Sequence, residues 1–534
     1  MSITTASQVE PRWMERRSMP FWVPLMLVLA CSGRSVSPRT APAGSALERD
    51  AVIEGRRLRY ALHLAAQPNL VYHLDCITGV ALCAQVIYRE LWSTFAMSAE
   101  DEAALATWKA VRGRHAGELR TVDPPRPPQP LLAPSRVFDL AERQRIVGLR
   151  VRTPAEYQAT IAVLSTDADA RELRQIVERF APRFLRWWQE RGFAAGSTSF
   201  EGFAKLLADP FLDSTIQKAA RFYEADLPEG TTFQIHVLVQ PTSSRKLSVA
   251  YQLEGDSVVE SPEGENPEDR IDIIAHELFH YFFFRMDPKR QSAMIESVCA
   301  SDDPLSVVAF GVLDEAVATA LGNGVVGQHY ERPDAFAKQL ARGLTRNRAT
   351  APIAREIFPS MSSFFDRGTT VSSDEFLRAF YRATKATFAN GRPRPIDYLH
   401  SPVLIADARF ASAAQRLRDA SDAGFPSLRE FASLNGEAKT FLREHPFISV
   451  AVLVPDTAGT VLESLGLADR HGAALSSVAA RTRGFVYALS RTAKSNAFIF
   501  AAGDSKTMND LVDRFAALTE LAPGHDGVLI ELAN

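Results

Sequence analysis

The chain has 534 residues, which is enough for roughly two to four domains with large apolar cores. Hydrophobic residues make up 46% of it and charged residues 23%, the composition of a soluble globular protein. The formal net charge of −3 provides no basic surplus, so nucleic acid is not an expected partner.

The N-terminal segment has the pattern of an export signal. Arg12, Arg16 and Arg17 precede an apolar run over residues 19–30. This run is too short to span a bilayer, because a spanning helix needs about 20 residues. A basic start, a short apolar stretch and a small final residue predict a signal peptide over residues 1–30.

Residues 28–32, Val-Leu-Ala-Cys-Ser, resemble the lipobox of bacterial lipoproteins. The resemblance implies that Cys31 is lipidated, becomes the mature N-terminus and anchors the protein to a membrane of the bacterial cell envelope. Leu29 is a less typical lipobox residue, so a secreted or periplasmic protein without the lipid is the alternative. Residues 31–46 are rich in Ser, Arg, Pro, Gly and Ala and are expected to form a flexible tether.

Three cysteines follow the tether, Cys76, Cys83 and Cys299. An exported chain folds in an oxidising compartment, where cysteines can pair. Cys76 and Cys83 lie in a segment with a helical pattern, which predicts a separation of about 10 Å along the helix axis. Because that separation is too large for a disulfide, all three are expected to be small buried apolar side chains.

Residues 47–122 are predicted to form a helical N-terminal region. Apolar residues recur at helical spacing in stretches such as 58–64 and 91–95. Residues 123–135 are predicted to be a stiff proline-rich connector, because proline does not fit inside a helix or a central strand.

Residues 136–440 are predicted to form the next domain, in which a small sheet lies between helices. Alternating β-branched residues predict strands at 232–239 and 247–253. A polar loop over residues 260–268 leads into a helix over 267–284. Further helices are predicted at 137–149, 168–191, 199–208, 212–224, 334–344, 373–389 and 407–419.

The helix over 267–284 contains the motif H-E-x-x-H. His276 and His280 are one helical turn apart, so their side chains share one face and can bind the same metal ion. Glu277 projects to the side, where it can hold a metal-bound water. The alternative is an ordinary core helix, but burial of two imidazoles and a carboxylate without a metal would be costly. The motif therefore predicts a catalytic zinc site.

A catalytic zinc ion has three protein ligands and one open position. A third histidine at the close spacing of some zinc peptidases would fall near residues 289–290, which are lysine and arginine. Residues 313–324 predict an alanine-lined helix with a glycine stop, and its small side chains allow close approach to the motif helix. Glu315 on this helix is the predicted third ligand, and Glu296 and Asp302 are the alternatives.

The chain resembles the gluzincin group of zinc metallopeptidases through His276, Glu277, His280 and Glu315. The resemblance covers a small part of the chain and implies a zincin-like core, a Zn²⁺ cofactor and a peptide or protein substrate. It also implies that one of the two predicted strands holds the substrate by strand addition. Many gluzincins have a supporting aspartate where this chain has Thr319. Support for a zinc histidine is then expected from Asp272 or from a backbone carbonyl.

The expected chemistry is hydrolysis of a peptide bond. Zinc lowers the pKa of a bound water to about 7, and Glu277 acts as the general base that passes the proton to the leaving amine. In gluzincins the oxyanion donor is commonly a Tyr or His beyond the third ligand. Tyr381 is the first candidate here, and Tyr330, His329 and His400 are the alternatives.

Residues 445–534 are predicted to form a small α/β domain without a phosphate-binding glycine motif. Short apolar strands are predicted at 447–454, 485–489, 497–501 and 527–532, with helices at 457–465 and 505–520. The whole chain is thus predicted to be α+β and mostly helical. It has a helical N-terminal region, a zincin-like core with a helical second lobe, and the small C-terminal domain.

Together these patterns predict an exported, lipid-anchored zinc metallopeptidase. The alternative from another class is a non-catalytic cell-envelope binding lipoprotein, in which the zinc site stiffens the fold. A protein side chain in the fourth zinc position would favour that alternative. A zinc hydrolase that acts on a non-peptide bond is the third hypothesis.

Overall fold

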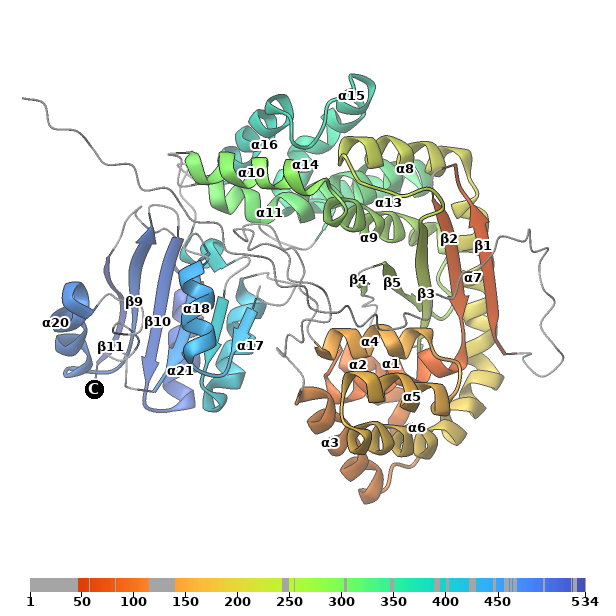
Figure 1. The fold of residues 1–534 in the computed structure, drawn as a ribbon, viewed down its shortest axis with the longest axis horizontal. Helices are drawn as coiled ribbons and strands as arrows, with labels where there is room; N and C mark the ends of the chain where they lie inside the picture. The colour runs from red at the N-terminus through yellow and green to blue at the C-terminus, as the bar shows by residue number, and fades with distance from the viewer. Residues whose placement is uncertain are drawn as a thin grey trace, which may run out of the picture. The chain divides into compact units, whose positions relative to one another are not determined.

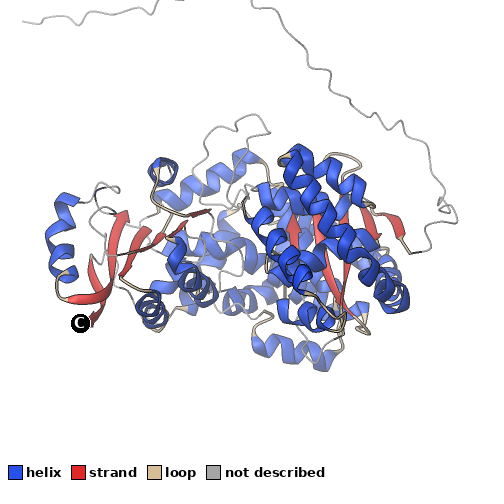
Figure 2. Ribbon diagram, turned by 90° about the horizontal axis from the view of Figure 1, so that it is seen from below, coloured by secondary structure: helices blue, strands red, loops and turns tan. Residues whose placement is uncertain are grey.

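The protein contains two β-sheets, each with its own helices (Figure 1, Figure 2). The computed structural model describes residues 47–56, 58–81, 83–114, 140–242, 249–253, 255–301, 305–345, 350–388, 394–399, 403–421, 429–444, 448–455, 461, 463, 468–492, 495–519, 521 and 526–533. The predicted signal peptide, tether, lipidation site Cys31 and proline-rich connector lie outside these residues.

The first sheet has five strands in the order β1-β2-β3-β5-β4. They are β1 (Arg49–Glu54), β2 (Arg59–Leu64), β3 (Thr232–Gln240), β4 (Ala250–Leu253) and β5 (Asp256–Pro262). Strands β2, β3 and β5 are parallel, and the outer strands β1 and β4 run antiparallel to their neighbours. Of the two strands predicted to hold a substrate, β3 is paired on both sides, so only β4 lies at an edge of the sheet.

Parallel strands need long crossover connections, and the connection from β2 to β3 contains a layer of helices. Its members are α1 (Ala66–Thr78), α2 (Gln85–Ser93), α3 (Ala99–Gly113), α4 (Leu140–Arg150), α5 (Pro154–Leu164), α6 (Asp167–Trp187), η1 (Trp188–Gly192), α7 (Phe193–Leu207) and α8 (Pro210–Phe222). Helices α3 and α5 begin with capping boxes at Ser98 and Thr153, which satisfy the free amides of the first turn. Figure 1 shows α1–α6 grouped below the sheet.

The helices that follow β5 include the predicted metal-binding helix. They are η2 (Pro267–Asp269), α9 (Ile271–Phe284), α10 (Pro288–Ala300), α11 (Leu305–Thr319), η3 (Ala320–Val326), α12 (Gly327–Tyr330), α13 (Pro333–Arg342), α14 (Thr350–Ile357), η4 (Phe358–Ser360), α15 (Met361–Asp366) and α16 (Asp374–Thr387). One continuous apolar cluster joins α9, α10, α11, η3, α14, α15 and α16 to the sheet and to the helices before it. The predicted helices over 267–284, 334–344 and 373–389 are confirmed with shifted ends.

The helical prediction for residues 47–64 is wrong, because these residues form β1 and β2. In β2, Tyr60, Leu62 and Leu64 are 1%, 0% and 0% exposed, so the apolar residues alternate with a period of two. The pairing partner that stabilises this strand is β3, about 170 residues further along the chain. The N-terminal region therefore contributes two strands to the sheet and becomes helical only from Ala66.

The loop prediction for residues 260–268 is wrong at its beginning, because Glu260 lies inside strand β5. Asp256, Ser257, Glu260 and Ser261 are all buried in this strand. Each has hydrogen-bonding capacity, and side chains from the helical layer supply the partners of Asp256 and Glu260. A strand with so many buried polar residues has the composition of a loop, which explains the error.

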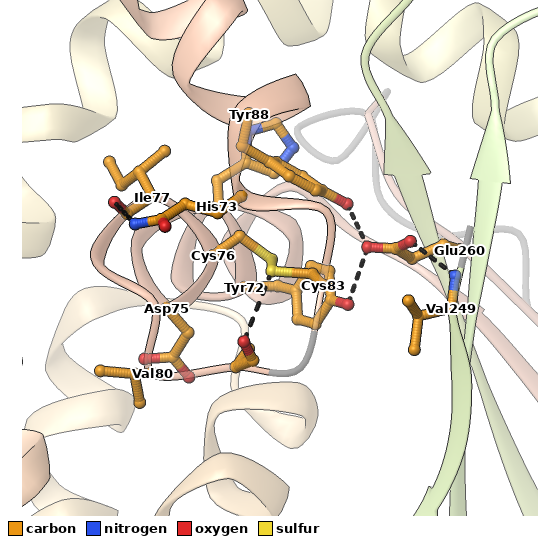
Figure 3. Close-up of a disulfide and its surroundings, with 12 residues drawn as sticks. Tyr72, His73, Asp75, Cys76, Ile77, Val80, Cys83, Tyr88, Val249 and Glu260 are labelled. Carbon is orange, nitrogen blue, oxygen red and sulfur yellow. Dashed lines mark hydrogen bonds between the residues drawn. A yellow bond between two sulfur atoms is a disulfide. The ribbon is translucent and has the colours of Figure 1, made fainter. Parts of the chain in front are cut away.

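The prediction that Cys76 and Cys83 cannot pair is also wrong, because they form a disulfide with Cα atoms 5.8 Å apart (Figure 3). Helix α1 ends at Thr78, and Gly79 has the left-handed backbone conformation, with φ of 74°. The chain turns back there, as Val80 and Ala81 donate to the Asp75 carbonyl. Cys83 therefore returns to Cys76 instead of continuing along a helix.

The second sheet has six strands in the order β11-β9-β10-β8-β6-β7. Its elements are η6 (Pro395–Leu399), β6 (Val403–Ala406), η7 (Ala408–Phe410), α17 (Ala411–Ala420), β7 (Arg429–Phe431), α18 (Gly436–Glu444), β8 (Val450–Val454), α20 (Ala468–Ala479), β9 (Thr482–Thr492), β10 (Ser495–Ala502), α21 (Ser505–Ala516) and β11 (Gly527–Ala533). The strands predicted at 447–454, 485–489, 497–501 and 527–532 are present as β8, β9, β10 and β11 with shifted ends. Strands β6 and β7, which precede residue 445, pair alongside β8 in the same sheet.

Candidate metal centre

The candidate metal centre begins with α9, which is apolar on most of its surface. Ile274, Leu278 and Phe282 are 0–1% exposed, so the helix is held in the core on several sides. His276 and His280 lie on the same face, with ring centroids 4.6 Å apart. Their Nε2 atoms are 2.9 Å apart. The one-turn spacing in the sequence therefore brings the two imidazoles together as predicted.

Glu315 on α11 completes the cluster. Its Oε2 atom is 3.2 Å from His280 Nε2 and 3.7 Å from His276 Nε2. The three donor atoms all lie within 4.8 Å of one another. Donors bound at about 2.0–2.2 Å to one tetrahedral zinc ion lie roughly 3.3–3.6 Å apart, so these spacings fit a zinc ion.

Small side chains bring α11 against α9. Ala316, Ala318 and Ala320 are fully buried, and α11 with its continuation η3 packs along α9. The helical stretch Val308–Tyr330 is long and apolar enough to cross a membrane by length and composition, but 72% of its most apolar window is buried in the fold. It therefore has the burial of a core helix, and it brings Glu315, Asp314 and Asn323 to the two histidines.

Asp314 orients His280. The Nδ1 atom of His280 is 3.0 Å from the Asp314 carboxylate, so Nδ1–H donates there and Nε2 faces Glu315. Burial alone would lower the pKa of His280, but Asp314 and Glu315 hold that pKa well above 6.5. Burial would likewise raise the pKa of Glu315, but His276 and His280 hold it well below 4.5. The cluster therefore favours a positive charge at its centre, which a metal ion would supply.

Asn323 and Asp272 orient His276. The Asn323 Oδ1 atom is 3.1 Å from His276 Nδ1, and Asn323 Nδ2 donates to Asp272 Oδ2 at 2.7 Å. Asp272 is 3% exposed, and its burial raises its pKa. Asp272, which was expected to support a zinc histidine, reaches His276 only through Asn323, because Asn323 makes the contact with the histidine.

Asn323 reaches His276 because the helix changes its winding. Residues 320–326 form the π-helical segment η3, and the helix continues to Tyr330. The predicted glycine stop at residues 322–324 is wrong. A β-carbon on Gly322 would lie 2.7 Å from the His276 Cβ atom and 2.8 Å from the Asp272 carbonyl oxygen. The glycine therefore allows η3 to approach α9 closely. Wider π-helical turns of this kind are frequent at functional sites.

The other predicted residues fall in different surroundings. Glu277 is 3% exposed on α9, directly after His276. Glu296 is exposed on α10 and is not part of the cluster, while Asp302 lies outside the described residues. Thr319 is fully buried, and its hydroxyl has no hydrogen-bond partner among the described residues. The acids that are hydrogen-bonded to the histidines directly or through Asn323 are Asp314 and Asp272, and neither is at position 319.

The candidate oxyanion donors are spread over the fold. Tyr381 lies partly buried on α16, packed against the main core, so its catalytic role stays a prediction. His329 stacks on Phe211 with ring centroids 3.6 Å apart, next to Tyr330, and His400 lies outside the described residues.

Sequence reasoning did not identify Tyr223, the residue that follows α8. Tyr223 is fully buried, and burial together with the charges of Asp314 and Glu315 raises its pKa well above 10. No motif marks this residue, since its closeness to the cluster arises from the packing of α8 against α9.

The donor set suits zinc better than a hard cation, since two imidazole nitrogens and one carboxylate oxygen are typical ligands of catalytic zinc. Each histidine also has a partner on its other nitrogen, which fixes the tautomer that a metal ligand needs. Comparison of the chain with known protein families, with curated proteins and with solved structures finds no match in any of the three.

Proposed function

We propose that the protein is a zinc-dependent metallopeptidase of gluzincin type, with a zincin-like core built from the five-stranded sheet and helices α9 and α11. The observation that carries the proposal is the convergence of His276 Nε2, His280 Nε2 and Glu315 Oε2 within 4.8 Å. The hydrogen bonds of Asp314 and Asn323 to the two Nδ1 atoms support it, because they leave both Nε2 atoms to bind a metal ion.

The chain's own residues have separate tasks in this proposal. When bound, zinc would supply a Lewis acid that lowers the pKa of water to about 7 and polarises the scissile carbonyl. Glu277 accepts the proton of the attacking water and returns it to the leaving amine nitrogen. Strand β4, which pairs only with β5 among the described strands, presents its other edge to an extended peptide. Tyr381 is the proposed donor to the oxyanion.

Export to the cell envelope remains part of the proposal. The Cys76–Cys83 disulfide supports it, since stable disulfides form in oxidising compartments. The expected product of the export signal is a mature chain that begins at lipidated Cys31. Intact-mass measurement of the protein from membranes would test this, and a mature chain that keeps residues 1–30 would contradict it.

The catalytic proposal can be tested with protein that lacks residues 1–31. The purified protein should contain about one zinc ion per chain, and His276→Ala and His280→Ala should lose it. Glu277→Gln should keep the zinc ion and lower peptide hydrolysis by about a hundredfold or more, as loss of a general base does. Full activity of Glu277→Gln would refute the mechanism. Zinc without hydrolysis of any peptide, or hydrolysis of a different bond class in a substrate screen, would refute the peptidase assignment.

A further inference from the structure

A buried carboxylate, Glu260 on β5, holds four hydrogen-bond donors, of which Figure 3 shows Tyr72, Tyr88 and Val249. The hydroxyl groups of Tyr72 and Tyr88 donate to its Oε1 atom at 2.8 and 2.6 Å. The Val249 amide and the Gln240 side-chain amide donate to its Oε2 atom at 2.8 and 3.1 Å. Glu260 is 1% exposed, so all four donors act on a carboxylate that water does not reach.

One of these donors sets the position of strand β4. Val249 directly precedes β4, and its amide donates to the Glu260 side chain while its carbonyl accepts from the Glu260 amide at 3.1 Å. Glu260 therefore holds both backbone groups of Val249. Among the described strands, β4 pairs only with β5, and α9 packs against it. The four-residue strand next to the metal-binding helix thus begins at a contact that Glu260 makes.

The two tyrosines come from helices that the disulfide joins. Tyr72 lies one turn before Cys76 on α1, and Tyr88 lies on α2, which begins two residues after Cys83. Burial raises the pKa of both tyrosines well above 10, so both hydroxyl groups stay protonated and can donate. The disulfide fixes the corner between α1 and α2, and this corner directs both hydroxyl groups to the same Glu260 oxygen (Figure 3).

We propose that Glu260 is a positioning residue for the substrate-binding edge: Tyr72 and Tyr88 hold its carboxylate, and the carboxylate holds the start of β4 at Val249. The proposal rests on the proposed peptidase function, since it assigns β4 as the strand that an extended peptide joins. A peptide that adds to β4 needs the strand ordered before it binds. Loss of the contact at Val249 therefore weakens binding of extended substrates and leaves the metal ligands in place.

The test uses the Tyr72→Phe/Tyr88→Phe double variant, which keeps both rings and removes both hydroxyl donors. Tyr157→Phe is the matched control, because Tyr157 is fully buried and its hydroxyl has no hydrogen-bond partner among the described residues. Amide hydrogen exchange of residues 249–253 should be about tenfold faster or more in the double variant and unchanged in the control. The KM for an extended peptide should rise by a similar factor, while kcat and zinc content stay within about twofold.

The outcomes separate the parts of the proposal. Unchanged exchange of residues 249–253 would overturn the role of Glu260, whatever the activity. Faster exchange with an unchanged KM would overturn β4 as the substrate edge. If the wild-type protein hydrolyses no peptide, the exchange result still decides whether Glu260 holds β4, and the peptidase proposal fails separately. Should the double variant not fold, Glu260→Gln removes the charge at nearly the same volume and must show the same faster exchange.

Discussion

Gly322 and His276 are packed so closely that a β-carbon on the glycine would lie 2.7 Å from the His276 Cβ atom. Real β-carbons do not approach other atoms to that distance, so the contact requires glycine. It is also the contact that brings η3 to α9 and sets Asn323 beside His276. The hydrogen bond from Asn323 to His276, a proposed metal ligand, therefore depends on a residue without a side chain.

The variant Gly322→Ala should push η3 away from α9 and weaken zinc binding by about 10–100-fold, the usual effect of disturbing groups that orient a ligand. Zinc affinity in competition with a chelator measures this. Gly311→Ala on α11 is the matched control, because its new methyl group would meet no atom of the described residues within 4 Å. The control should keep its zinc affinity and gain up to about 1 kcal/mol of stability from the better helix former. Equal zinc affinities of the two variants would contradict the close-approach argument.

Asn323→Leu tests the hydrogen-bonded link between Asp272 and His276. The variant removes the acceptor of His276 Nδ1 and the donor to Asp272, so zinc affinity should again fall by about 10–100-fold. Thr319→Val is the comparison, since the Thr319 hydroxyl is buried without a partner in the described structure. It should bind zinc as the wild-type protein does. If Thr319→Val bound zinc more weakly and Asn323→Leu bound it normally, His276 would not be supported by Asn323. The support would then come from position 319, where many gluzincins have an aspartate.

The motif helix and the helix of Glu315 could be predicted because their signals are local. Apolar residues at helical spacing surround His276 and Glu315. Two residues one turn apart on a helix must lie on the same face. Asn323 could not be predicted in the same way. A glycine on each side of it indicates a helix end, and only packing against α9 shows that the helix widens and continues.

The missed strands have a similar cause. Leu58, Leu62 and their neighbours fit a helical spacing and also alternate with a period of two, so the sequence pattern fits both structures. Pairing of β2 with β3 decides between them, and β3 is distant in the chain. Strand β5 was missed because Glu260 resembles a loop residue until the donors from α1 and α2 are known.

The disulfide should contribute about 2–2.5 kcal/mol to the free energy of unfolding, as expected for the short loop that it closes. The Cys76→Ala/Cys83→Ala variant should show this loss in urea unfolding. Its zinc content should be unchanged, because neither cysteine belongs to the candidate metal centre. A reductant should destabilise the wild-type protein by the same amount and leave the variant unaffected. Free thiols at both cysteines in the unreduced, unfolded wild-type protein would contradict the pairing.

His73 should make the stability of the helical layer depend on pH. It is fully buried against Tyr88, Phe184 and Trp187, and burial lowers its pKa to about 3. The unfolded chain binds a proton at His73 below about pH 6.5 and the folded protein does not. This contribution to stability is therefore present above pH 6.5 and is lost as the pH falls toward 3.

The variant His73→Leu removes this dependence. Between pH 6.5 and 4.5, the stability difference between the wild-type protein and the variant should change by up to about 1.4 kcal/mol per pH unit, in favour of the variant at lower pH. Urea unfolding followed by tryptophan fluorescence measures it. Glu260 changes the stability with pH in the opposite direction, because burial raises its pKa to about 7. Its contribution to the free energy of unfolding is therefore present below pH 4.5 and is lost as the pH rises through 7. Both proteins contain Glu260, so its effect cancels in the difference. Parallel pH profiles would show that His73 is protonated in the folded protein or exposed to water.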